Sequence, residues 1–270
     1  MYKKFIRAKP KNKILITVPH AGNFYPDIFI NNLNIKLDKI RKIEDFESDK
    51  IINLIDKNNA DMIIAQCSRV VVDLNRSRLA IDNSMFKEEF YNGLIEESKM
   101  IEYGLGVFPK TINGTLIFKK KLSITYPKFM LENYYDPFHD CLSKKIKHLT
   151  KLFGYCYHID LHTMPSKALV NLKKEPDIVL GNNFGNSCSL KLVNYFKKMF
   201  ENNGLVVEIN KPYAGGFITR NYGNPSLGCH SLQIEINRKL YMNEKKNCIN
   251  NLNPLQKLFA NIFNNFDLLL

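Results

Sequence analysis

The sequence has no tryptophan, and its 11 prolines and 13 glycines form no long tract. Hydrophobic residues make up 45% of the chain and charged residues 24%, an ordinary composition for a globular protein. These absences argue against a disordered or repeat architecture. No linker stands out, so we expect a single domain over residues 1–270, long enough to bury a substantial core.

The six cysteines occur singly, and no Cys-x-x-Cys pair marks a structural zinc or redox site. We expect them to be reduced. Residues 1–7 lack an apolar signal core, and no run approaches the ~20 apolar residues that a membrane span requires. The sequence therefore predicts a cytoplasmic protein with no membrane partner.

Acidic residues are the minority charge: 26 Asp and Glu stand against 39 Lys and Arg, for a net charge of +13. Such an excess can concentrate anionic ligands or nucleic acid near the surface. The lysines are scattered in short groups and form no nucleic-acid motif. A small anionic substrate fits the excess better than specific nucleic-acid binding, and the oligomeric state is left open.

Apolar, β-branched runs alternate with helix-like stretches, which is typical of an α/β fold. Strands are predicted at residues 13–18, 61–66, 69–73, 155–161, 177–180, 205–209 and 231–236. Helices are predicted at residues 45–58, 136–153 and 188–202. Between residues 77 and 125 the periodicity is weak, so long loops and short elements are expected there, where a lid would lie.

Two histidines come at the ends of predicted strands, where side chains leave the packed interior and ligand sites form. His20 follows the first strand, and Gly22 just after it allows a tight turn and a close approach of the backbone. His162 shares its side of a strand with His158 and Asp160, and a carboxylate there can fix the tautomer of a ligating imidazole. Each histidine can also be a packing or hydrogen-bonded residue, so both interpretations stay open.

A catalytic zinc ion normally takes three protein ligands and leaves a fourth position for water. Two histidines therefore need an acid as the third ligand. The acidic cluster of residues 44–49 supplies candidates at the start of the helix predicted over residues 45–58. The alternative is that these acids only oppose the positive N-terminus of that helix.

Two arginines, Arg69 and Arg76, bound a predicted strand, and Asn75 stands beside the second. Because arginine pairs bidentately with carboxylate, Arg76 and Asn75 could clamp a substrate carboxylate, with surface salt bridging as the alternative. A later loop combines a glycine pair with Tyr213 and Arg220. Such a loop can close over a substrate.

A polar face is predicted on the last strand, where Gln233, Glu235 and Asn237 alternate with isoleucines. Polar side chains inside an otherwise apolar sheet indicate a cleft. Glu235 could serve as a general base that takes a proton from a water molecule and passes it to a leaving nitrogen. A charge pair between Glu235 and Arg238 is the structural alternative.

Taken together, these segments resemble the N-formylglutamate amidohydrolase family. They occur in family order from about residue 13 to residue 245. The matching pieces are Val18-Pro19-His20-Ala21-Gly22 with Tyr25-Pro26, Ser68-Arg69 to Asn75-Arg76, Ile159-Asp160-Leu161-His162-Thr163-Met164, Asp177-Ile178-Val179-Leu180-Gly181 with Ser187-Cys188, and Asn210-Lys211-Pro212-Tyr213 through Gln233-Ile234-Glu235-Ile236-Asn237-Arg238 to Met242.

The resemblance implies a relative of the zinc carboxypeptidases, with a phosphorylase/hydrolase-like α/β fold: a mixed, mostly parallel sheet flanked by helices. It implies one zinc ion held by His20, His162 and an acid, for which Asp49 matches better than Glu47. It implies Glu235 as the catalytic base. The substrate-binding residues that it implies are Asn75, Arg76 and Arg220, with Tyr213 and Arg69 as further candidates.

The reaction implied by the resemblance is zinc-dependent hydrolysis of N-formyl-L-glutamate to formate and L-glutamate, in histidine degradation. The segment 77–126 departs from the family pattern, so a related N-acyl amino acid or a small peptide is also a candidate substrate. A zinc carboxypeptidase or an amidase acting on cell-wall fragments would use similar residues. A basic ligand- or nucleic-acid-binding protein without catalysis is the non-enzymatic possibility.

Overall fold

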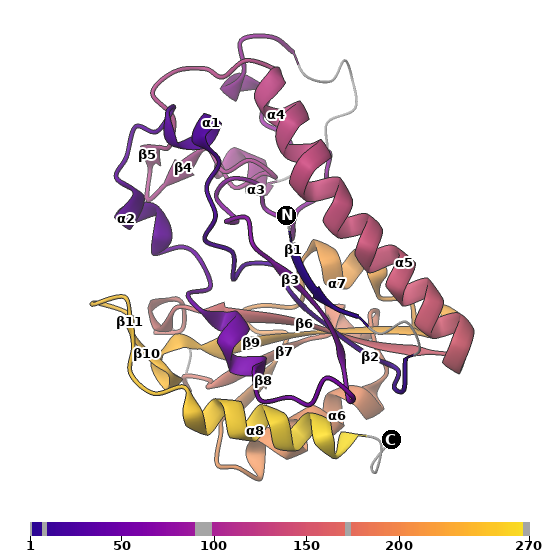
Figure 1. Ribbon diagram of the computed structural model, residues 1–270. Helices are drawn as coiled ribbons and strands as arrows, with labels where there is room; N and C mark the ends of the chain where they lie inside the picture. Colours follow the sequence, from indigo (N-terminus) through magenta and orange to yellow (C-terminus); the bar gives the residue numbers. More distant parts are fainter. Residues whose placement is uncertain (1, 7–9, 90–98, 171–173, 267–270) are drawn as a thin grey trace.

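The computed structural model describes residues 2–6, 10–89, 99–170 and 174–266, and a seven-stranded sheet runs through them (Figure 1). In spatial order its strands are β1 (Tyr2–Phe5), β3 (Asp61–Ala65), β2 (Ile14–Val18), β6 (Cys156–Met164), β9 (Cys229–Asn237), β7 (Ile178–Gly181) and β8 (Val207–Ile209). Strands β3, β2, β6 and β9 are parallel, β1 and β7 join this group antiparallel, and β8 is parallel to β7. The predicted mixed, mostly parallel α/β sheet is confirmed.

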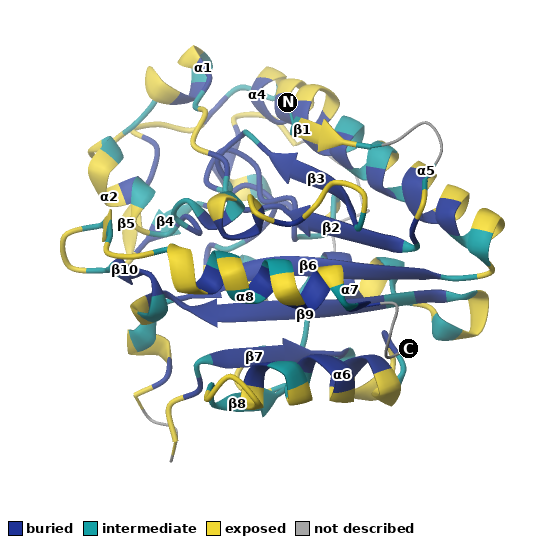
Figure 2. Cartoon of the chain, turned by 60° about the horizontal axis from the view of Figure 1, so that its bottom comes forward, coloured by how far each residue is buried: buried dark blue, intermediate teal, exposed yellow. Residues whose placement is uncertain are grey.

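Helices cover both faces of this sheet. The first face carries α6 (Leu190–Glu201) and α8 (Asn253–Asn264), whose buried side chains join one core cluster with β2, β6 and β9. Figure 2 shows these two helices with their exposed residues turned away from the sheet. The second face carries α5 (Asp136–Phe153) and α7 (Phe217–Tyr222), which belong to a separate cluster. No helix among the described residues is long and apolar enough to span a membrane.

Short elements make up the rest of the described chain. They are α1 (Asp27–Ile30), α2 (Leu37–Arg41), η1 (Ser48–Ile52), η2 (Asn83–Met85), α3 (Lys99–Glu102), the hairpin β4 (Thr111–Ile112) and β5 (Thr115–Leu116), and α4 (Thr125–Met130), which continues through η3 (Leu131–Tyr135) into α5. The remaining ones are η4 (Ser166–Ala168), η5 (Asn183–Gly185), η6 (Pro225–Leu227), η7 (Arg238–Leu240) and the pair β10 (Met242–Asn243) and β11 (Cys248–Ile249). The predicted absence of long elements holds over residues 77–89 and 99–124.

Three local predictions need correction. The helix predicted over residues 45–58 is only the single 3₁₀ turn η1, and α8 was not predicted at all. Residues 69–73 form a turn instead of a strand, because Val71 N–H bonds back to the carbonyl of Ser68. Strand β6 runs on to Met164, paired with β9 throughout, so that His162 lies within a strand and not after it.

Candidate active site

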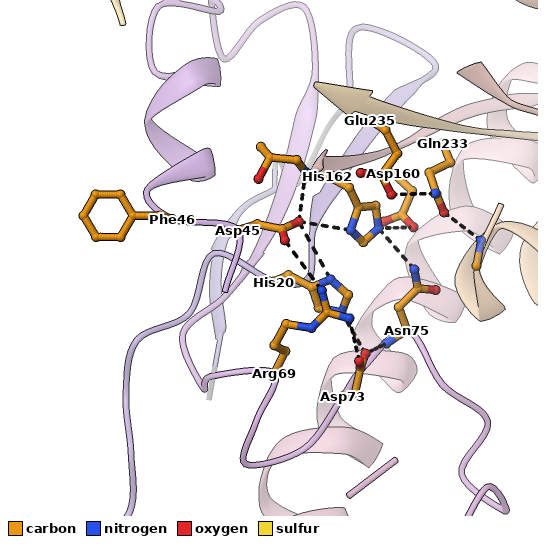
Figure 3. Close-up of polar contacts among 12 residues, drawn as sticks. His20, Asp45, Phe46, Arg69, Asp73, Asn75, Asp160, His162, Gln233 and Glu235 are labelled. Carbon is orange, nitrogen blue, oxygen red and sulfur yellow. Dashed lines mark hydrogen bonds and ion pairs between the residues drawn. The ribbon is translucent and has the colours of Figure 1, made fainter. Parts of the chain in front are cut away.

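His20, Asp45 and His162 come together beside the carboxyl ends of β2 and β6, and their ligand atoms all lie within 4.8 Å of one another (Figure 3). All three residues are buried. Asp45 Oδ2 is 3.3 Å from His162 Nδ1 and 3.8 Å from His20 Nδ1. Ligands at ~2.0–2.1 Å around a tetrahedral zinc ion would be separated by about 3.3 Å, close to these values.

Close backbone packing places His20. The turn after β2 lies against the end of β3, where Phe24 N–H bonds to the carbonyl of Gln66 at 2.9 Å. Gly22 allows this approach, because a Cβ there would meet the Cys67 carbonyl oxygen at 2.2 Å. The glycine therefore lets the two backbone segments pack in contact, as the sequence suggested. This packing fixes the path of the chain that carries His20.

Two further carboxylates orient the two imidazoles. Asp73 Oδ1 lies 2.7 Å from His20 Nε2, and Asp160 Oδ2 lies 3.0 Å from His162 Nε2. An ionised carboxylate only accepts hydrogen bonds, so each Nε2 carries a proton, and each Nδ1, facing the centre of the cluster, is the nitrogen that a metal could take. This is the carboxylate–histidine arrangement found around bound metals.

The donor set fits a divalent metal. His20 Nδ1 is buried and has no hydrogen-bond partner among the described residues, although a buried polar nitrogen without one is costly. Burial, together with the charge of Arg69, lowers the pKa of His20 to about 4, so its ring is neutral, as a ligand must be. Two imidazole nitrogens and one carboxylate are a ligand set used by catalytic zinc.

Cations hold Asp45 in its charged form. Arg238 Nη2 lies 3.2 Å from Asp45 Oδ1, and Thr163 N–H bonds to Oδ2 at 3.0 Å. Arg69 Nη1 approaches Oδ1 to 3.6 Å, while Nη2 of the same side chain pairs with Asp73 at 2.8 Å. Burial opposes ionisation, but the hydrogen bond with His162 and the charge of Arg69 outweigh it and lower the pKa of Asp45. Arg69 is thus already paired with two acids at this site.

The structure does not bring Asp49 to the histidines. Asp49 lies on η1 and lines a separate cavity of about 380 Å³, as does Glu47. The chain turns sharply after Asp45, because Ser48 N–H bonds back to the Asp45 carbonyl at 3.0 Å. The acidic cluster does supply a carboxylate to the two histidines, but it is Asp45, and Asp45 replaces Asp49 as the candidate third ligand.

Glu235 lies beside the cluster because β9 pairs with β6 in a register that sets Glu235 opposite His162. Gln233 Nε2 donates to Glu235 Oε1 at 2.9 Å, and Gly216 N–H donates to Gln233 Oε1 at 2.7 Å. Burial raises the pKa of Glu235 to about 7, against the lowering effect of His162. The alternative charge pair with Arg238 is not formed, since the Arg238 guanidinium turns to Asp45.

Cationic side chains gather next to the cluster. Burial lowers the pKa of Arg76, and the charges of Arg69 and Arg220 lower it further. Arg76 Nε donates to the Leu105 carbonyl at 2.9 Å, which fixes the side chain from the middle segment of the chain. Arg220, on α7, is exposed. This arrangement favours anions.

Asn75 and Tyr213 have neighbours that the sequence did not predict. Asn75 Oδ1 accepts the N–H of Ile218 at 2.8 Å at the start of α7, so this amide fastens the helix that carries Arg220. Gly216 has no room for a side chain there, because a Cβ would meet Asn75 Nδ2 at 2.1 Å. Tyr213 is partly buried, and its pKa is raised by burial and by the charge of Glu235 nearby.

Sequence reasoning missed Asp73 and the role of Arg238. Asp73 lies in a turn, where no alternation marks the side that a residue faces, although its spacing of four from Arg69 fits the pair that they form. Arg238 follows β9 directly, but its contact with Asp45 joins residues 193 positions apart. Separations of this length leave no local pattern in a sequence.

Known proteins resemble this chain in sequence and in fold. The N-formylglutamate deformylase of Pseudomonas putida is 28% identical over 241 residues, covering 86% of this chain and 82% of the relative, and that of Pseudomonas aeruginosa PAO1 is 25% identical over 239 residues, covering 86% and 83%. The crystal structure of N-formylglutamate amidohydrolase from Ralstonia eutropha JMP134 matches with a TM-score of 0.92 at 25% identity, covering 99% of this chain and 98% of that one. A gene product of Agrobacterium tumefaciens shares the fold, with a TM-score of 0.67 at 18% identity over 98% of this chain and 96% of that one. The model of the N-formylglutamate amidohydrolase family matches residues 12–242, and the chain belongs to this family.

Proposed function

We propose that the protein hydrolyses the amide bond of N-formyl-L-glutamate to formate and L-glutamate, with one zinc ion held by His20, Asp45 and His162. The observation that carries the proposal is the buried cluster of these three residues with Glu235 beside it. The names of the relatives support the substrate. The resemblance further implies a role in histidine degradation, which stays a prediction.

A zinc ion bound there would lower the pKa of a water molecule and polarise the formyl carbonyl. Glu235 is suited to take the proton of that water, because its raised pKa makes it a better base than an exposed carboxylate. The water oxygen adds to the formyl carbon, the C–N bond breaks, and Glu235 returns the proton to the leaving nitrogen. The products are formate and glutamate.

The arginines are assigned to the substrate carboxylates. Arg76 and Arg220 lie close enough for their charges to interact, which is unfavourable until an anion comes between them. N-Formylglutamate carries two carboxylates, and a guanidinium can bind each of them through two parallel hydrogen bonds. Arg69 contributes positive potential, although its own hydrogen bonds go to Asp45 and Asp73.

The test combines a metal assay on purified protein with formate release from N-formyl-L-glutamate, in the unchanged protein and in His162→Ala. His148→Ala is the matched control, because His148 is exposed on α5 and lines another pocket. We expect about one zinc per chain and formate release, both lost only in His162→Ala. Metal without formate would keep a hydrolase and reopen the substrate, with amino-acid release from peptides indicating a carboxypeptidase. Absence of metal from the unchanged protein would contradict the proposal.

A further inference from the structure

A continuous line of hydrogen bonds leads away from His162 into the interior of the sheet. Asp160 Oδ1 accepts from the Thr17 hydroxyl at 2.6 Å, Thr17 Oγ1 is 2.8 Å from His158 Nε2, and His158 Nδ1 is 2.8 Å from Ser231 Oγ. We call Thr17, His158 and Ser231 the relay. All three side chains are fully buried.

The register of the sheet fixes the relay. Thr17 on β2 is paired with Asp160 on β6, and His158 on β6 is paired with Ser231 on β9. These side chains share one face of the sheet with His162, and on that face apolar residues would form an ordinary core. Buried polar groups are retained only when they are hydrogen-bonded, so each member depends on the next.

The direction of every bond follows from the number of protons available. Asp160 Oδ1 accepts the hydroxyl proton of Thr17 at 2.6 Å, the shortest contact of the line. Thr17 must then give its single proton to Asp160, and the contact at its own oxygen must be filled by an N–H of His158 Nε2. His158 Nδ1 is left as the acceptor for Ser231.

The far end of Asp160 meets His162. Its Oδ2 accepts a hydrogen bond from His162 Nε2–H, which leaves Nδ1, on the side of Asp45 and His20, as the nitrogen that a metal could take. Asn75 Nδ2 lies 3.2 Å from the same Nε2, but Asn75 is held by its bond to Ile218 and its amide nitrogen cannot accept that proton. All bonds of the relay therefore point one way, and the relay holds Oδ1 of Asp160 while Oδ2 bonds to His162.

We propose that Thr17 and His158 are positioning residues for the metal site: acting through Asp160, they fix the tautomer and ring orientation of the ligand His162. The inference rests on the proposed metal site. It adds Thr17 and His158 to the residues that hold this site, beyond the carboxylate of Asp160. Loss of an outer partner of a ligating histidine weakens metal binding about 10- to 100-fold. For Thr17, one bond further out, we expect about 10-fold, the low end of this range.

The experiment measures zinc affinity by competition with a chelator in Thr17→Val, which keeps the side-chain shape and removes the hydroxyl. Thr17→Ser restores the hydroxyl and should restore the affinity. Thr219→Val is the matched control, because Thr219 is equally buried and its hydroxyl has no partner among the described residues. We expect about 10-fold weaker binding in Thr17→Val alone. An affinity equal to that of the unchanged protein, or an equal loss in Thr219→Val, would overturn the proposal.

A second measurement needs no substitution. Long-range ¹H–¹⁵N correlation of the histidine rings at neutral pH should show neutral His158 with its proton on Nε2, and a proton on Nδ1 would reverse the relay and refute the inference. Failure of the metal site itself is recognised separately, because the unchanged protein would then bind no zinc. If it binds zinc and Thr17→Val binds it equally well, only the relay is wrong.

Discussion

Two variants, Asp45→Asn and Asp49→Asn, test which acid is the third metal ligand. The structure selects Asp45, whereas the sequence favoured Asp49. Asp45→Asn removes the charge that lies between both histidines and Arg238. Loss of an outer partner of a metal ligand already costs about 10- to 100-fold in affinity, so loss of a ligand carboxylate should exceed about 100-fold. Asp49→Asn should leave zinc affinity unchanged.

The same pair of variants should differ in folding stability. Asp45→Asn leaves the buried Arg238 without its counter-charge, which costs about 3–5 kcal/mol in comparable buried pairs. Asp49 sits where burial raises its pKa, so a neutral amide suits the position and the change should stay below about 1 kcal/mol. Urea unfolding of the metal-free proteins measures the change in the free energy of unfolding. Chelator competition under folding conditions measures zinc affinity. Full zinc affinity in Asp45→Asn together with loss in Asp49→Asn would refute the reasoning.

Two further predictions concern catalysis. Glu235→Gln should lower kcat by about 10²- to 10⁴-fold at normal metal content, because an amide cannot take the proton; retained turnover would reject Glu235 as the base. Glu235 accepts a proton only when it is ionised, and burial raises its pKa to about 7. We therefore expect kcat/KM to fall as the pH drops through this value, or through a lower one where a bound cation lowers the pKa of Glu235. Arg76→Ala should reduce kcat/KM about 10- to 100-fold, the equivalent of one charged hydrogen bond, with zinc retained. Arg78→Ala, whose side chain pairs with Asp136, is its control, and equal kinetics in both variants would remove Arg76 from substrate binding.

The fold was predictable where one element carries its own pattern. The apolar runs that became β2, β3 and β7 each bury their side chains on both faces of the sheet, and such runs are recognisable without their neighbours. The amphipathic pattern gave α5 with its bounds unchanged. The strand prediction for residues 69–73 was wrong because it relied on the same kind of local pattern. A valine run is typical of a strand, yet these valines are buried in a turn that packs on the core.

The sequence alone determined the family, the class of fold and the candidates His20, His162 and Glu235, because each of these depends on short motifs or on the alternation of a single strand. Only the tertiary structure decided which acid joins the histidines, since Asp45 and Asp49 belong to one acidic cluster and differ in the side of a turn that they face. It also decided the partners that hold the site, Asp73 for His20 and Arg238 for Asp45. These contacts connect residues 53 and 193 positions apart, and such pairings arise only when strand register and loop packing bring distant segments together.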